Sequence, residues 1–305
     1  KEQEAKARPQ TPKTAQGYRA EEIQFRSLTD DIQLGATLTL PEGDGPFPAA
    51  ILLTVAGANN RDQSHSTGHK PFLVLADHLS KAGIAVLRYD DRGVGESEGS
   101  LMESNFEDFT EDALAAFNYL AERKEIDASK VGYIGNSEGT VIASMAAIKE
   151  RKVAFTIQLG AVGVPLRELS EDRLERMDEM YQLTELQKSE ILEYYRILDE
   201  IIHSDLKETD KVKAISEIPA ENTFGKADFP HQLFFLPKEK AKRIELYLSP
   251  WYKAQASFHP KDILPKVKCP GLIINGSLDL FQHPELNFPP IEAYVKEGGN
   301  TDVSF

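Results

Sequence analysis

The chain of 305 residues contains a single cysteine, Cys269, and therefore cannot form an intrachain disulfide. Cys269 precedes a proline and an apolar run, which favours a buried structural thiol over a reactive one. No stretch approaches the roughly 20 apolar residues that a membrane-spanning helix needs. Basic residues do not predominate either: 35 Lys and Arg face 49 Asp and Glu, a formal net charge of -14. This balance argues against nucleic acid or an anionic membrane as a partner.

Patterns that would indicate a metal or a cofactor are missing as well. No paired-cysteine spacing accompanies His65 and His69, which form the one His-x-x-x-His spacing of the sequence, and the glycine-rich segment 92–95 lacks the spacing of a phosphate or dinucleotide loop. We therefore predict no metal and no cofactor. The chain begins at Lys1 rather than Met, so we expect that an N-terminal segment has been removed or omitted. The protein would be periplasmic or secreted if that segment was a signal peptide, and cytoplasmic otherwise; the oligomeric state stays open.

The remaining composition, with 41% apolar and 28% charged residues, is that of a globular protein. Residues 1–17 lack an apolar period and predict a flexible arm. Apolar strands and amphipathic helices then alternate, which predicts an α/β protein with a mostly parallel, doubly wound sheet. Strands are expected at 23–26, 32–38, 49–55, 84–87, 131–134, 153–159, 271–274 and near 303–305, and helices at 71–83, 106–120, 138–149 and 289–297.

A helical block interrupts this alternation. Residues 163–260 are highly charged and contain no convincing strand, and residues 191–202 form one strongly amphipathic helix. A helical block between two sheet strands predicts a cap over the carboxyl edge of the sheet, where open α/β sheets place their sites. The expected core therefore comprises residues 18–162 and 261–305.

The strongest chemical signal is the segment Gly135-Asn136-Ser137-Glu138-Gly139 between a predicted strand and a predicted helix. A G-x-S-x-G in this context is typical of the nucleophile elbow of α/β-hydrolases. The sharp turn holds the serine in a strained conformation, and small flanking residues avoid clashes. Ser137 is thus the predicted nucleophile.

Stabilisation of an oxyanion is predicted from two places in the chain. In this fold, the loop after the strand at 49–55 supplies one backbone N–H and the residue after the nucleophile supplies another. The loop runs from Thr54 to Asn60, and Gly57 gives its backbone freedom. The predicted donors are therefore the N–H groups of Ala58 and Glu138.

Several longer segments resemble the carboxylesterase-like bacterial branch of the α/β-hydrolases, whose members are often described as serine peptidases. They are Gly68-His69-Lys70-Pro71-Phe72, Leu87 to Ser97, the elbow, Leu248-Ser249-Pro250-Trp251-Tyr252 and Val267 to Asp279. The resemblance extends over most of the chain from about Glu21. It implies that Asp279 is the acid of a catalytic triad, where its carboxylate would orient an imidazole. Asp90, Asp91 and Arg92 are expected to brace their loop.

The catalytic histidine of such a triad follows the acid in the chain order of this fold. His283 is the only histidine after Asp279, but it lies in the same turn and is a weak candidate. We expect instead that the natural protein continues past Phe305 and carries the histidine there. His69 is expected near the oxyanion loop as a pocket-wall residue. The other histidines have no partner pattern and are predicted to be ordinary surface or core residues: His65, His78, His203, His231 and His259.

The sequence therefore predicts a serine hydrolase that cleaves a small-molecule carboxylic ester through an acyl-enzyme on Ser137. Thioesterase, peptidase and acyltransferase activities on the same machinery stay open, because selectivity depends on the cap and the pocket. A non-catalytic binding protein on a hydrolase scaffold is the alternative from another class.

Overall fold

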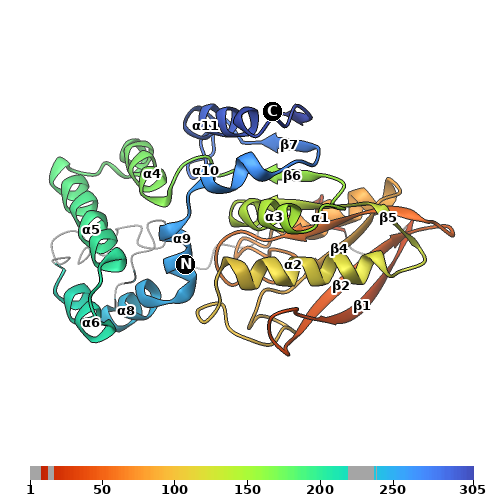
Figure 1. Ribbon diagram of the computed structural model, residues 1–305, viewed down its shortest axis with the longest axis horizontal. Coiled ribbons are helices and arrows are strands. Elements are labelled where there is room, and N and C mark those ends of the chain that lie inside the picture. Colours follow the sequence, from red (N-terminus) through yellow and green to blue (C-terminus); the bar gives the residue numbers. More distant parts are fainter. Residues whose placement is uncertain (1–7, 13–16, 219–236, 238) are drawn as a thin grey trace.

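The computed structural model describes residues 8–12, 17–218, 237 and 239–305 (Figure 1). The predicted arm at 1–17 lies mostly outside these residues. One eight-stranded sheet runs through the core in the order β1-β2-β4-β3-β5-β6-β7-β8. The pairs β1–β2 and β2–β4 are antiparallel, and every other neighbouring pair is parallel. The strands are β1 (Tyr18–Arg26), β2 (Gln33–Pro41), β3 (Phe47–Leu53), β4 (Ala85–Tyr89), β5 (Ile126–Asn136), β6 (Thr156–Leu159), β7 (Gly271–Ile274) and β8 (Val303–Ser304).

Helices cover both faces of this sheet, as the near-continuous apolar run of β3 predicts. Ala49 and Ile51 pack in one hydrophobic cluster with α2 (Phe106–Ala121) and α3 (Glu138–Lys149). The alternate residues Ala50 and Leu52 pack in another cluster with α1 (Pro71–Lys81). Successive side chains of a strand point to opposite faces, so one apolar strand contributes to both layers. Beside β7, α10 (Pro260–Ile263), the 3-10 turn η2 (Leu264–Lys266) and α11 (Pro284–Glu297) complete the core.

Most predicted elements are present, and α3 has the predicted bounds 138–149. The helix predicted at 289–297 begins earlier, at Pro284, and Pro289 and Pro290 lie inside it. Pro284 occupies the first turn, where proline is tolerated because its missing N–H has no partner within the helix. The Nδ1 atom of His283, the N-cap, accepts the N–H of Glu285 at 3.3 Å. The N-cap and Pro284 therefore define the start of α11, and Pro289 and Pro290 do not.

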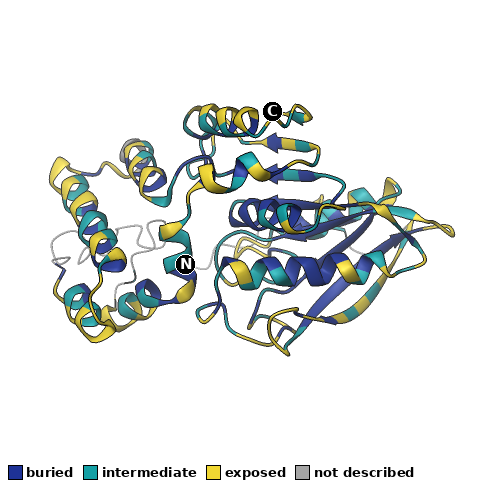
Figure 2. Cartoon of the chain, viewed as in Figure 1, coloured by how far each residue is buried: buried dark blue, intermediate teal, exposed yellow. Residues whose placement is uncertain are grey.

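The helical block lies between β6 and β7, to the left of the sheet in Figure 1. It contains α4 (Leu166–Tyr181), α5 (Glu185–His203), α6 (Glu208–Glu217), α8 (Lys240–Leu248) and α9 (Pro250–Ser257). Buried aromatic and aliphatic side chains form a hydrophobic cluster in it, including Tyr194, Leu198, Tyr247 and Trp251, and Leu101 of the core joins this cluster. Figure 2 shows buried segments among exposed ones on the helices of the block. Helices of the described chain are all too short or too polar to cross a bilayer.

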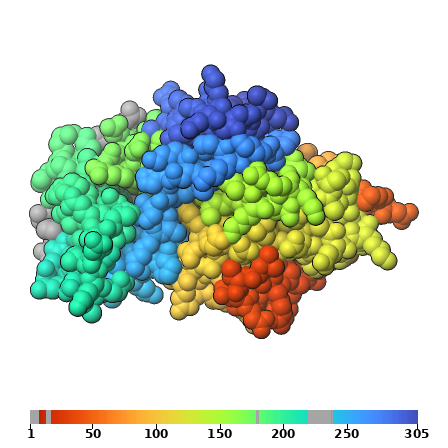
Figure 3. All heavy atoms as spheres, in the orientation of Figure 1, coloured from red at the N-terminus to blue at the C-terminus, as the bar shows by residue number. Residues whose placement is uncertain are grey.

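The helical block joins the core through α9 and the segment that follows it. Figure 3 shows this segment, around residues 250–260, along the boundary between the block and the core. Ser249 caps α9 by accepting the N–H of Tyr252 at 3.1 Å, and Pro250 occupies the first turn. The start of α9 is therefore fixed by local chemistry at the place where the block contacts the core.

Candidate active site

Ser137 lies in the sharp turn between β5 and α3, with a φ of 52° and a ψ of -112°. A positive φ is uncommon for a residue with a side chain and stores backbone strain. Hydrogen bonds hold this turn on both sides. The Ser137 N–H donates to the carbonyl of Leu159 on β6 at 2.8 Å, and the N–H of Thr140 donates to the Ser137 carbonyl at 2.9 Å.

The two glycines of the motif permit this turn because the backbone passes too close for a side chain. A Cβ on Gly135 would overlap the carbonyl of Gly139, and a Cβ on Gly139 would overlap the carbonyl of Leu53 on β3. Glycine is therefore required at both positions, because the end of β5 contacts the first turn of α3 and that turn contacts β3.

Ser137 opens into a cavity of about 420 Å³ between the core and the helical block. Asp279, from the turn after β7, lines the same cavity, so the predicted nucleophile and the predicted acid are brought to one site. Apolar side chains make up much of the wall: Val55, Ala56, Val141, Val162, Leu166, Leu169, Phe258 and Phe281. The polar residues at the wall are Gln63, His65, Asn136, Ser137, Glu138, Arg173, Gln255, Asp279 and Gln282.

Gln282, which the sequence analysis did not single out, connects these two residues. Its side-chain Nε2 donates to the Ser137 Oγ at 3.3 Å. The carboxylate of Asp279 accepts the backbone N–H groups of Phe281 at 2.8 Å and of Gln282 at 3.1 Å. An amide cannot accept the proton of the serine hydroxyl as a base, so Gln282 positions the nucleophile without activating it.

Two histidines, His65 and His283, line cavities at this end of the sheet. His65 lines the Ser137 cavity, and its ring stacks on that of His69 with centroids 6.2 Å apart. The sequence analysis treated His65 as an ordinary residue. Its position in the loop between β3 and α1, which also carries the predicted oxyanion donor, is the signal that could have found it. His283, the weak candidate, lines a different cavity together with Asp279 and Arg176.

The carboxylate of Asp91 holds the loop after β3, in keeping with the predicted brace. Asp91 accepts the hydroxyl of Thr54 at 2.7 Å and the N–H of Asn59 at 2.8 Å. Burial raises the pKa of Asp91 to about 7. Within this loop Ala56 lines the Ser137 cavity, whereas the side chain of Ala58 is exposed. The oxyanion role of the Ala58 N–H stays a prediction.

Arg92 and Asp90 continue the brace next to that loop. Arg92 donates through Nε and Nη2 to the carboxylate of Asp112, at 2.7 and 2.9 Å, in a buried pair. Asp90 accepts the guanidinium of Arg61 at 2.6 Å. Burial alone would raise the pKa of Asp90, but the bonds from Arg61 lower it. These pairs connect the strand end to the loops around it.

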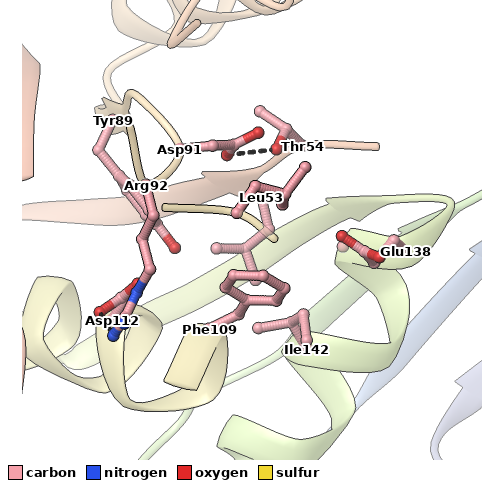
Figure 4. Close-up of a pocket in the computed structure, with 11 residues that line it drawn as sticks. Leu53, Thr54, Tyr89, Asp91, Arg92, Phe109, Asp112, Glu138 and Ile142 are labelled. Atoms are coloured by element: carbon pink, nitrogen blue, oxygen red, sulfur yellow. Dashed lines mark hydrogen bonds and ion pairs between the residues drawn. The ribbon is translucent and has the colours of Figure 1, made fainter. Parts of the chain in front are cut away.

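Glu138, the residue after Ser137, connects the elbow to the helical block. Its side chain is buried, with 8% of the residue exposed. Its Oε2 accepts the indole N–H of Trp251 at 2.9 Å and the amide of Gln255, both on α9. Burial raises the pKa of Glu138 to about 8, and repulsion from Asp91 adds to the shift. Figure 4 shows Glu138 at the start of α3 and Asp91 with Thr54 on the other side of a small cavity behind the elbow.

A known family and several known proteins resemble part of this chain. The family described as serine aminopeptidase, S33, matches residues 64–207. The esterase EstD of Thermotoga maritima is 33% identical over 147 residues, which are 48% of this chain and 35% of that protein. The polyketide transferase claH of Penicillium crustosum is 31% identical over 144 residues, which are 47% of this chain and 44% of that protein. The matched segment spans less than half the length of either relative.

Among solved structures, an esterase of Pyrococcus furiosus has a TM-score of 0.57 at 16% identity, covering 94% of this chain and 81% of the other. The chain has the α/β-hydrolase fold. The predicted fold class is thereby confirmed. At this identity the structural likeness shows the fold alone and not a reaction or a substrate.

Proposed function

We propose that this α/β hydrolase is a serine esterase that cleaves a carboxylic ester through an acyl-enzyme on Ser137. The observation that carries the proposal is the position of Ser137, held at positive φ in the elbow and facing a 420 Å³ cavity that Asp279 also lines. The similarity of this chain to the esterase EstD supports the same reaction class.

In the proposed reaction the Ser137 Oγ attacks the ester carbonyl and transfers its proton to an imidazole base. The N–H of Glu138 and an N–H of the loop after β3 stabilise the oxyanion. The base then protonates the departing alcohol, leaving the acyl group on Ser137. Water, deprotonated by the same base, releases the acid and restores the serine.

The base has three candidates. One is a histidine outside the given sequence, as the chain order of the triad in this fold implies. His65 is the candidate that lines the Ser137 cavity, and His283 is the candidate that lies beside Asp279 in sequence. Separate His65→Gln and His283→Gln variants distinguish them. A variant that removes the base lowers kcat by at least a hundredfold, whereas a structural histidine leaves the rate within a few fold.

The test is hydrolysis of p-nitrophenyl acetate and butyrate by this chain and by the product of the complete gene, each with its Ser137→Ala variant. Labelling with a fluorophosphonate reports the reactive serine independently of the substrate. We expect turnover and labelling that Ser137→Ala abolishes. If the complete product shows neither, the proposal is wrong and a binding role is favoured.

Acyl transfer to an acceptor other than water is the second candidate, favoured by the 31% identity to a polyketide transferase. Ester, thioester and aminoacyl-anilide substrates, compared side by side with and without an added alcohol, separate the possibilities. A transferase would form more transfer product than free acid when the alcohol is present, whereas an esterase would form mostly acid.

A further inference from the structure

A buried side-chain amide at the wall of the Ser137 cavity has a free hydrogen-bond donor. Gln63, in the loop between β3 and α1, lines this cavity although only 3% of the residue is exposed. Its Oε1 accepts the side-chain amide of Asn136, the residue before Ser137, at 3.4 Å. None of the described residues accepts a hydrogen bond from the Nε2 of Gln63, and protein atoms do not close this atom off. Its N–H groups are therefore available to a molecule bound beside the nucleophile.

Gln63 destabilises the folded chain in two ways. Buried polar groups are nearly always hydrogen-bonded, and a donor without an acceptor loses its hydration for no return. The backbone of Gln63 is also strained, because its φ of 50° lies in the left-handed region that residues with a side chain rarely adopt. Such features concentrate at functional sites. Both are explained when a substrate atom accepts the hydrogen bond from Nε2.

The residues directly before Gln63 fix its position in the loop. The backbone N–H of Arg61 donates to the carboxylate of Asp90 at 2.7 Å, directly after β4. The carboxylate of Asp62 accepts the Nε of Arg88, a residue of β4, at 2.9 Å. The bond between Gln63 and Asn136 adds a third attachment, to the elbow itself. A donor that is fixed before the substrate binds needs no reorganisation while charge develops, and this property makes an oxyanion hole effective.

We propose that Gln63 is a further catalytic residue, whose Nε2 donates a hydrogen bond to the oxyanion that forms when Ser137 attacks the ester. The inference rests on the proposed function and adds a side-chain donor to the two backbone N–H groups. As the bond from the Ser137 Oγ to the carbonyl carbon forms, the electron pair of the C=O π bond moves to the oxygen and the imidazole base takes the serine proton. Nε2 stabilises this oxygen until the C=O bond forms again and the alcohol leaves. The amide itself gains and loses no proton.

Hydrolysis of p-nitrophenyl acetate and butyrate at pH 8 by the product of the complete gene tests this role with two variants. Gln63→Glu keeps the shape and the acceptor for Asn136, but its carboxylate has no N–H to donate. Gln63→Met removes donor and acceptor without adding a charge. Each variant should lower kcat for both esters by about a hundredfold and leave KM within a few fold, because the donor acts on a charge that only the transition state carries.

The matched control is Gln158→Met, at another buried glutamine, on β6. Its Nε2 donates to the hydroxyl of Ser144 at 3.2 Å, and it does not line the Ser137 cavity. This variant should keep kcat within a few fold of the wild type, and thermal unfolding verifies that every variant is folded.

The two Gln63 variants separate donation from the other roles of the side chain. A loss of kcat in Gln63→Met alone would assign a structural role through Asn136, and a loss in Gln63→Glu alone would assign simple charge repulsion; either result overturns the proposal. Wild-type rates in both variants, or a change in KM alone, overturn it as well and leave the esterase reaction intact. Absence of both turnover and fluorophosphonate labelling in the unmodified protein would refute the proposed function and this inference with it.

Discussion

The stability of the Glu138→Gln variant relative to the wild type should increase as the pH rises. The carboxyl of Glu138 is buried beside Trp251 and Gln255, and burial raises its pKa from the ordinary value of 4.5 to about 8. Between these values the folded chain holds a proton that the unfolded chain has lost. Folding then takes up a proton, so this group lowers the free energy of unfolding as the pH increases from about 4.5 to 8.

The size of the effect follows from proton linkage. One proton corresponds to about 1.4 kcal/mol per pH unit, so the wild type should lose roughly 2–3 kcal/mol relative to Glu138→Gln between pH 5.5 and 7.5. Glutamine keeps an acceptor for the indole N–H and nearly the same shape, so packing changes little. Other titrating groups contribute equally to both proteins and cancel in the difference.

Urea unfolding followed by circular dichroism at pH 5.5, 6.5 and 7.5 measures this difference. The substitution Glu103→Gln, at an exposed carboxylate, is the control and should show no pH-dependent difference from the wild type. A difference between Glu138→Gln and the wild type that stays constant with pH would refute the assignment of a protonated, buried carboxyl.

Three further substitutions test the packing around the site. Asp112→Asn should lower the free energy of unfolding by about 3 kcal/mol, because it breaks the buried pair with Arg92. Gly139→Ala should destabilise by about 3 kcal/mol or prevent folding, because the added Cβ overlaps the carbonyl of Leu53. Trp251→Phe should cost about 1–3 kcal/mol and raise the pKa of Glu138 further, because a buried acceptor loses its donor.

Each of these has a measurable contradiction. The matched control for Asp112 is Asp31, which pairs with Arg26 at the surface, and Asp31→Asn should change the free energy of unfolding little. If both substitutions lower the free energy of unfolding by a similar amount, the buried pair has no special role. Wild-type stability in Gly139→Ala would mean that the elbow can relax. For Trp251→Phe, the stability difference from the wild type should stay constant below about pH 7 and grow as the pH rises through about 8, where Glu138 loses its proton in the wild type first; a difference that stays constant up to pH 9 would contradict the coupling.

The sequence was sufficient for the layers of the core because burial on both faces of β3 leaves a continuous apolar run, while α2 keeps a helical period of apolar residues. It was insufficient at β5, which begins at Ile126. The polar residues 127–130 resemble a turn, yet they belong to a strand whose first residue pairs with Phe47. The start of β5 is determined by its pairing with β3, and the local sequence pattern carries no information about that pairing.

The same distinction applies to the candidate site. The elbow could be predicted because its two glycines, which avoid steric overlap in the turn, lie within a five-residue motif. Gln282 could not be predicted as a partner of Ser137, since 145 positions separate the two residues in the chain. Arg173 lies in a helix with charged residues on several sides, and only the folded block shows that it lines the cavity.

The bond between Glu138 and α9 has a consequence for protein engineering. Replacing the helical block by another one would place the junctions after β6, which ends at Leu159, and before β7, which begins at Gly271. A foreign cap joined there would leave Glu138 without the indole of Trp251 and the amide of Gln255. A buried acid directly beside the serine would then lack its donors. Grafts should therefore retain residues 249–257 from this chain, or change Glu138 together with the cap.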